Sequence, residues 1–166
     1  MTRQPATGPG NWVLLSYRMP REPSTPRITI WRKLKRLGVA QLGDGLIALP
    51  ADARTREQLD WIAEEIVESG GTATVWLAQP ATLPQERELA AAMAAARSEE
   101  YRAVIDQATA AAGQPDRTRT VRRLRDELRR IHRRDYFPPT ERDTARHAVE
   151  ALAETRTTAD APEITP

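Results

Sequence analysis

The first half of the chain has an apolar pattern that predicts four strands and two helices. The dense run Trp-Val-Leu-Leu-Ser-Tyr at 12–17 is short, as expected for a central strand buried on both faces. Gly43-Asp44-Gly45 tolerates positive φ, which favours a tight hairpin turn between two strands. The remaining elements are predicted as strands at 39–42, 46–49 and 72–78 and as helices at 25–38 and 55–69.

Capping signals place the starts of both helices. Thr25 can cap the first helix, with Pro26 at its first position, and Thr55 with Gln58 matches a capping box for the second. The apolar positions expected to face the core are Ile28, Trp31, Leu34 and Leu37 in the first helix and Leu59, Ile62, Ile66 and Val67 in the second.

The order strand, helix, strand, strand, helix, strand is the ferredoxin-like βαββαβ arrangement, so an α+β fold is predicted. Two helices would cover one face of an antiparallel sheet. The strands are apolar enough that the other face also needs a cover, from later helices or from a second subunit. Trp76 alternates to that face, whereas Trp12, Trp31 and Trp61 are expected to lie in the core or at its border.

Three helices are predicted to follow as a C-terminal extension, at about 85–112, 116–134 and 140–154. Gly113-Gln114-Pro115 and Pro138-Pro139 separate them. Their expected packing positions are Leu89, Met93, Ala96, Val104 and Ala108 in the first, with Val121, Leu124, Leu128 and Ile131 at heptad spacing in the second. The predicted organisation is a disordered lead-in at 1–11, a core at 12–79, a helical extension packing on the core at 80–154 and a disordered tail at 155–166.

Composition excludes several kinds of site. The chain contains no Cys, which removes disulfides, thiolate catalysis and cysteine-containing zinc sites. The N-terminus lacks the apolar core of a signal peptide and no apolar run is long enough to span a membrane, so we expect a cytoplasmic protein.

The strongest charged feature lies between Asp116 and Asp135. It holds nine Arg against four acids, a local balance of 9 − 4 = +5. Arg binds phosphate through two hydrogen bonds and keeps its charge, so this helix predicts a nucleic-acid surface. The basic face of the first helix points the same way. The candidate contacts are Arg122, Arg125, Arg129, Arg130 and Arg133, assisted by Arg32, Lys33 and Arg36.

The alternative interpretation of this helix is a solvated face. Asp126 and Glu127 lie at helical spacing from Arg122, Arg123 and Arg130 and could pair with them.

We find no pattern that predicts catalysis, a metal site or a cofactor. His132 and His147 fall on separate helices without a carboxylate cluster, and no phosphate-binding glycine loop is present. Nucleases with a Cas2-type ferredoxin-like fold place a carboxylate at the end of the first strand, where this chain has Ser16-Tyr17-Arg18. We therefore expect no enzyme activity.

Several segments resemble the N-terminal domain of the chromate-resistance regulators of the ChrB family. They include Trp12-Val13-Leu14-Leu15, the run from Arg27 to Leu34, Leu37-Gly38, Leu46-Ile47-Ala48-Leu49-Pro50, Trp61-Ile62, Gly70-Gly71, Tyr101 and the stretch from Arg130 to Phe137. The resemblance covers roughly residues 11–154. Its core is also similar to the Cas2-like middle domain of PaaX-type repressors.

This resemblance implies a bacterial transcription regulator of chromate resistance. The partners it implies are operator DNA, a second copy of the chain and chromate as an inducer. Relatives carry a further C-terminal domain that is lacking here, so either the sensor half is a separate protein or this chain is a standalone relative. Two alternatives remain open: a protein-interaction module that recruits such a domain through the heptad seam, and a metal-dependent nuclease or chromate-handling enzyme.

Overall fold

The computed structural model describes residues 9–158, in two compact units. The first unit extends to Met93 and the second begins at Ala94. The boundary falls within one long helix, α3 (Leu83–Ala110), which contributes its first turns to one unit and the rest to the other. The predicted disordered ends lie largely outside the described residues.

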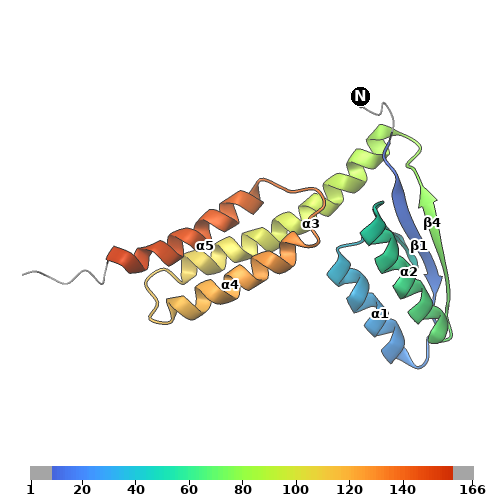
Figure 1. Cartoon of the computed structure of the whole chain (residues 1–166), viewed down its shortest axis with the longest axis horizontal. Helices are drawn as coiled ribbons and strands as arrows, with labels where there is room; N and C mark the ends of the chain where they lie inside the picture. The colour runs from blue at the N-terminus through green and yellow to red at the C-terminus, as the bar shows by residue number, and fades with distance from the viewer. Residues whose placement is uncertain (1–8, 159–166) are drawn as a thin grey trace, which may run out of the picture. The chain divides into compact units, whose positions relative to one another are not determined.

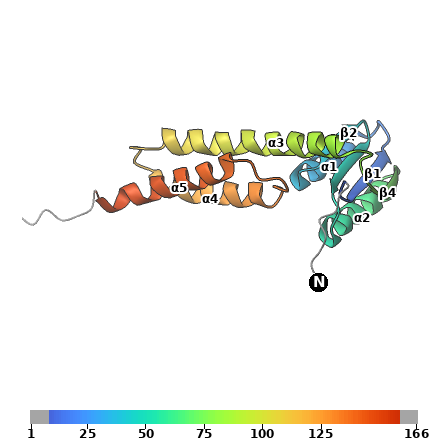
Figure 2. The ribbon, with the colours of Figure 1, turned by 90° about the horizontal axis from the view of Figure 1, so that it is seen from above.

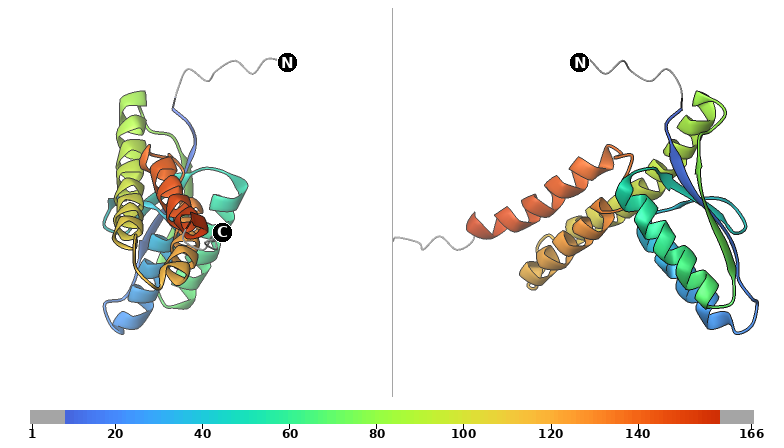
Figure 3. Two further views of the ribbon diagram at one scale, coloured as in Figure 1. Left: turned by 90° about the vertical axis from the view of Figure 1, so that its left-hand side faces the viewer. Right: turned by 45° about the vertical axis from the view of Figure 1, so that its right-hand side comes forward.

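The first unit is a four-stranded antiparallel sheet with two helices on one face (Figure 1). The strand order β2-β3-β1-β4 places β1 between β3 and β4. The right-hand view of Figure 3 shows α1 and α2 side by side over the sheet. The predicted α+β class and the βαββαβ order are confirmed. The elements are β1 (Trp12–Arg18), α1 (Ser24–Leu37), β2 (Ala40–Gly43), β3 (Leu46–Pro50), α2 (Ala53–Glu68) and β4 (Thr72–Ala78).

The core of this unit lies between the sheet and its two helices. Val13 and Leu15 of β1 are fully buried, and strand pairing places Leu49 and Leu77 beside Val13. The helices bury Ile30 and Leu34 from α1 and Leu59, Ile62 and Ile66 from α2.

The predicted core face of α1 was partly wrong. Ile28 is 44% exposed and Trp31 is half-buried. Residues two apart on a helix point about 200° from each other, so Ile28 and Ile30 cannot both face the sheet. Nor does Thr25 cap this helix, which begins at Ser24 after Pro23.

The capping box of α2 was also assigned to the wrong pair. Asp52 is the cap: its carboxylate accepts a hydrogen bond from the Thr55 backbone N–H (2.7 Å), and the Thr55 hydroxyl accepts one from the Asp52 N–H (2.9 Å). Trp61 and Val67, both expected to pack inside, are 63% and 56% exposed. They point away from the stripe that Ile62 and Ile66 press onto the sheet.

The second face of the sheet is covered only in part. The first turns of α3 lie over Trp12, whose indole N–H donates to the Glu86 carboxylate (3.0 Å) and which is 2% exposed. Trp76 lies on the same face but is 54% exposed, and its indole N–H donates to the Ser16 hydroxyl (3.1 Å). Within the first unit this face is therefore covered over Trp12 and open at Trp76.

The second unit is a bundle of three helices, in which the rest of α3 lies beside α4 (Arg117–His132) and α5 (Glu141–Thr158) (Figure 2). The left-hand view of Figure 3 looks along this bundle. The predicted stripe of α4 is confirmed, because Val121, Leu124, Leu128 and Ile131 are all buried. The cluster also contains Tyr101, Val104 and Ala108 of α3, Ala111 just after that helix, and Ala145, Val149 and Leu152 of α5. Ala96, expected to pack, is exposed.

Among the described residues, no helix combines the length and apolar character that crossing a bilayer requires.

Candidate nucleic-acid interface

The arginines of α4 face the solvent because the opposite side of the helix packs in the bundle. Because Leu124 and Leu128 are held in the bundle, residues offset from them around the helix must face outward. Arg122, Arg125, Arg129 and Arg133 recur at intervals of three or four and form one line, the arginine stripe. At 1.5 Å per residue, the stripe extends over about 16 Å.

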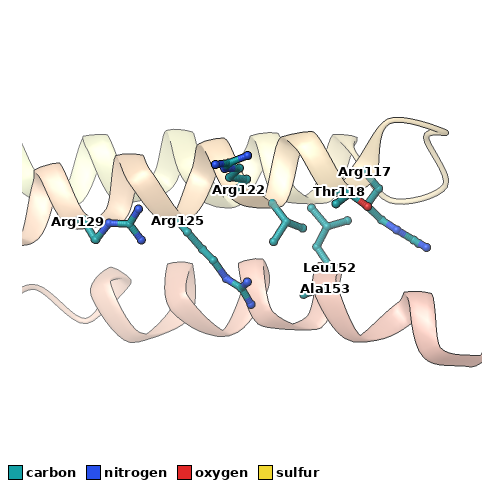
Figure 4. A pocket seen from close by; sticks show the side chains of 8 residues that line it. Arg117, Thr118, Arg122, Arg125, Arg129, Leu152 and Ala153 are labelled. Atoms are coloured by element: carbon teal, nitrogen blue, oxygen red, sulfur yellow. The ribbon is translucent and has the colours of Figure 1, made fainter.

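Part of this stripe borders a hollow of about 260 Å³ between α4 and α5. Arg122, Arg125 and Arg129 line it together with Arg117, which was not among the predicted contacts (Figure 4). In Figure 4 the Arg125 side chain extends from α4 toward α5. The rest of the lining is Thr118 and Val121 of α4 with Leu152 and Ala153 of α5.

Two of these guanidinium groups already form ion pairs with acidic side chains. Arg125 donates to both carboxylate oxygens of Glu150 (3.2 and 2.7 Å), and Arg129 pairs with Asp126. The hydrogen bond from Arg125 lowers the pKa of the Glu150 carboxyl. Counting the four lining arginines against Glu150 and Asp126 gives 4 − 2 = +2, so the hollow remains cationic.

The ion pairs confirm part of the solvated-face interpretation. Arg130 pairs with Glu127 (3.2 Å) as the spacing predicted, whereas Arg123 donates instead to Gln107 of α3 (2.7 Å). Arg122 and Arg133 make no ion pair within the described residues. Exposed pairs of this kind contribute about 0–1 kcal/mol each, so a phosphate can replace the carboxylate at little cost.

The eight predicted contacts are divided between the two units. Arg122, Arg125 and Arg129 meet at the hollow, Arg133 continues the stripe, and Arg130 lies farther around α4. Arg32, Lys33 and Arg36 belong to α1 in the first unit. Lys33 pairs with Glu65 of α2 (2.5 Å), and Arg36 lies in the last turn of α1, where a cation favourably meets the helix dipole.

Comparison with known proteins identifies the family of this chain. Residues 27–118 match the family described as "Protein ChrB, N-terminal", more than half of the chain. The chain belongs to this family. Protein ChrB of Cupriavidus metallidurans (strain ATCC 43123 / DSM 2839 / NBRC 102507 / CH34) is 29% identical over 109 residues, which cover 66% of this chain. The chain spans about 30% of the length of that relative.

Membership of the ChrB family supports the connection with chromate resistance that the resemblance implied. The family match starts within α1 and ends at Thr118, before Arg122. It therefore covers most of the ferredoxin-like unit and α3. The argument for the arginine stripe rests on its own geometry.

Sequence reasoning missed a polar cluster that joins α3 to the segment after α4 in this ChrB-family chain. The hydroxyl of Tyr101, which is fully buried, donates to the Asp135 carboxylate (2.8 Å). Arg134 and Arg97 both pair with Glu100, at 2.8 and 3.1 Å. Tyr101 and Asp135 were noted only as points of family resemblance, because 34 residues separate them and no local pattern links them.

The described residues contain no cluster of three or more His, Asp or Glu that could hold a metal ion. β1 ends in Tyr17 and Arg18. His132 is half-buried, and burial is the main cause that lowers its pKa, with Arg142 adding to the effect.

Proposed function

We propose that this chain is a cytoplasmic, dimeric transcription regulator of chromate resistance that binds DNA through the arginine stripe and has no enzymatic activity. The observation that carries the proposal is the cationic hollow, which Arg117, Arg122, Arg125 and Arg129 line. Family membership supports the chromate-resistance context.

Phosphate binding would proceed by exchange of partners. Arg122 and Arg133 are free to take a phosphate at once, whereas Arg125 must leave Glu150. The guanidinium group presents the same fork of donors to a phosphate as to a carboxylate, so the exchange needs little rearrangement. These contacts position the protein on DNA and carry no base specificity.

The same hollow suits chromate as an inducer. Chromate is a tetrahedral dianion whose oxygens accept hydrogen bonds as phosphate oxygens do. Bound between Arg122, Arg125 and Arg129, it would neutralise the groups that contact DNA. Release of DNA on addition of chromate is the expected result, and an equal effect of sulfate at the same concentration would argue against a specific inducer site.

A salt series tests the DNA proposal directly. Binding to the chain's own promoter would be measured by fluorescence anisotropy at increasing salt. Four phosphate contacts predict a slope of log affinity against log salt of about −3.6, and five predict about −4.5. The variant Arg122→Gln/Arg125→Gln/Arg129→Gln should weaken binding and reduce the size of the slope by about 2.7.

Arg119→Gln is the matched control, because Arg119 is exposed on the same helix but lies outside the hollow. Its slope should change by less than about one. No binding at low salt, a slope near zero, or an equal loss in the control would contradict the proposal.

The alternative of a protein-interaction module needs a different surface from the one predicted. Leu124 and Ile131 of the heptad seam are fully buried against α3 and α5, so the seam is not available to a partner. A separate C-terminal-type ChrB domain would have to bind elsewhere, and a pull-down that is unaffected by Arg129→Glu/Arg130→Glu would favour that function.

The enzyme alternatives predict turnover. Incubation of the full chain with DNA and Mg²⁺ or Mn²⁺, or with chromate and a reductant, should change the substrate no faster than the same mixture without the protein. Turnover in either assay would contradict a purely regulatory role.

A further inference from the structure

Strand β4 forms one edge of the sheet, and within residues 9–158 no strand lies on its outer side. It pairs with β1 along all seven residues without a register shift. Its sequence, Thr-Ala-Thr-Val-Trp-Leu-Ala, contains no charge and no proline. Charges, prolines, bulges and short length are the usual protections of an edge strand against pairing with another chain. β4 has none of them.

The opposite edge of the same sheet is protected. β2 is only four residues long, and its pairing with β3 shifts between Gln41 and Gly43. It leads directly into the Gly43-Asp44-Gly45 turn. The contrast between the two edges indicates that β4 is the one available for pairing.

The geometry of a strand restricts how two copies of β4 can pair. A two-fold axis perpendicular to an antiparallel sheet keeps each face on the same side, so the axis must pass through a residue. Pairing the full strand places that residue at Val75. The facing pairs are then Thr72 with Ala78, Ala73 with Leu77, and Thr74 with Trp76, each formed twice.

This register matches large exposed side chains with small ones. Leu77 is 62% exposed on the face that carries the helices, where it neighbours Val13. A hollow of about 370 Å³ on that face is lined by Ala73 of β4 and by Ala63, Glu64, Val67 and Glu68 of α2. In the full-length register, Leu77 of the second copy lies opposite Ala73, at this hollow. Trp76, 54% exposed on the other face, lies opposite Thr74.

We infer that two copies of this chain associate through β4, which pairs with itself about Val75 to make one continuous eight-stranded sheet. The interface is isologous: Leu77 of each copy fills the hollow beside Ala73 of the other. The inference rests on the proposed function only in calling for a dimer, because the association needs no DNA and uses none of the arginines.

Sedimentation of the full chain without DNA tests the association. A buffer of about 0.5 M salt screens the carboxylates of Glu64 and Glu68 that the two copies bring together. The wild-type chain should be a dimer, and Leu77→Lys should shift it to a monomer with an unchanged circular-dichroism spectrum. Ile28→Lys is the matched control, since Ile28 is also an exposed apolar residue but lies on α1, and this variant should remain a dimer.

The absence of cysteine makes the register itself testable. Val75→Cys places two thiols directly opposite each other, at a Cβ separation of about 4.5–5.5 Å that mild oxidation or a short bis-maleimide can bridge. Thr72→Cys is the control, because its two thiols would be separated by six residues of strand, about 20 Å. Covalent dimers should form with Val75→Cys alone.

A monomeric wild-type chain, a dimer that survives Leu77→Lys, or equal cross-linking of both cysteine variants would overturn the inference. A monomer that binds a peptide from another protein along β4 would assign the edge to that partner instead. Loss of DNA binding in a chain that still dimerises would refute the DNA proposal alone, so the two can fail separately.

Discussion

The guanidinium group of Arg125 on α4 donates two hydrogen bonds to the carboxylate of Glu150 on α5, at 3.2 and 2.7 Å. Both side chains are nearly half exposed. The pair joins α4 to α5 through Arg125, which also lines the cationic hollow. A carboxylate therefore occupies the position that a phosphate or chromate oxygen would take, and Glu150 competes with any anion that enters.

Removing that competitor should strengthen DNA binding. Glu150→Gln spares Arg125 the exchange of partners, so DNA affinity should rise, whereas the slope of log affinity against log salt, which counts the phosphate contacts, should stay the same. The free energy of unfolding should change by less than about 1 kcal/mol, because the pair is exposed. Fluorescence anisotropy and urea unfolding measure the two quantities.

Glu99→Gln provides the control for net charge. It removes one exposed carboxylate that pairs with Arg102 of α3, away from the hollow. If it raised DNA affinity as much as Glu150→Gln, the effect would be one of overall charge and the competition would be excluded.

The buried hydroxyl of Tyr101 should be needed for stability. Tyr101→Phe leaves the Asp135 carboxylate without its donor, which should lower the free energy of unfolding by about 1–3 kcal/mol. Tyr17→Phe removes a hydroxyl that makes no hydrogen bond with the described residues, and should change it by less than about 0.5 kcal/mol. Equal effects in urea unfolding at neutral pH would contradict the role of the Asp135 bond.

Tyr101 should also make the stability of the protein depend on pH in the alkaline range. Burial, together with the bond to Asp135, raises the pKa of Tyr101 above its ordinary value of 10.0. The folded protein therefore keeps a proton that the unfolded chain loses above that pH, so stability falls as pH rises above it. Tyr101→Phe should show a weaker fall, measured as the urea midpoint from pH 8 to about 11. Identical curves would refute the shift.

Glu141 should make the stability of the protein depend on pH in the acid range. Its pKa is lowered from 4.5 to about 2, first by the backbone N–H at the start of α5 and then by hydrogen bonds from Arg102 and Ser98. This contribution to stability is complete above pH 4.5 and is lost as pH falls toward 2. A titration followed by carbon-13 NMR should place the pKa of the Glu141 carboxyl near 2. In the variant Glu141→Gln, the free energy of unfolding should fall less steeply as the pH is lowered from 4.5 toward 2. A titration near 4.5 would contradict the assignment.

Local pattern was sufficient for the order and type of the elements. The spacing of Val121, Leu124 and Leu128 identified the buried side of α4, and so also placed the arginines outside. The strand predicted at 72–78 agrees with β4 residue for residue. These features depend on neighbours within one or two turns of chain, which is what periodicity records.

Features set by contacts between distant segments were not predictable. Nothing near Arg125 in the sequence points to Glu150, which lies 25 residues away on another helix. The exposure of Trp61 and Val67 follows from how α2 is rotated against the sheet, and a helix with apolar residues on several sides leaves that rotation open.

The sequence by itself determined a ferredoxin-like unit, a helical extension and an arginine-rich helix face, because each follows from side-chain periodicity and short-range turn chemistry. The tertiary structure decided which arginines share a hollow, which carboxylates neutralise them, and that β4 is an unprotected edge with Leu77 and a complementary hollow on the same face. These depend on strand order and helix rotation, which are set by the packing of the whole unit.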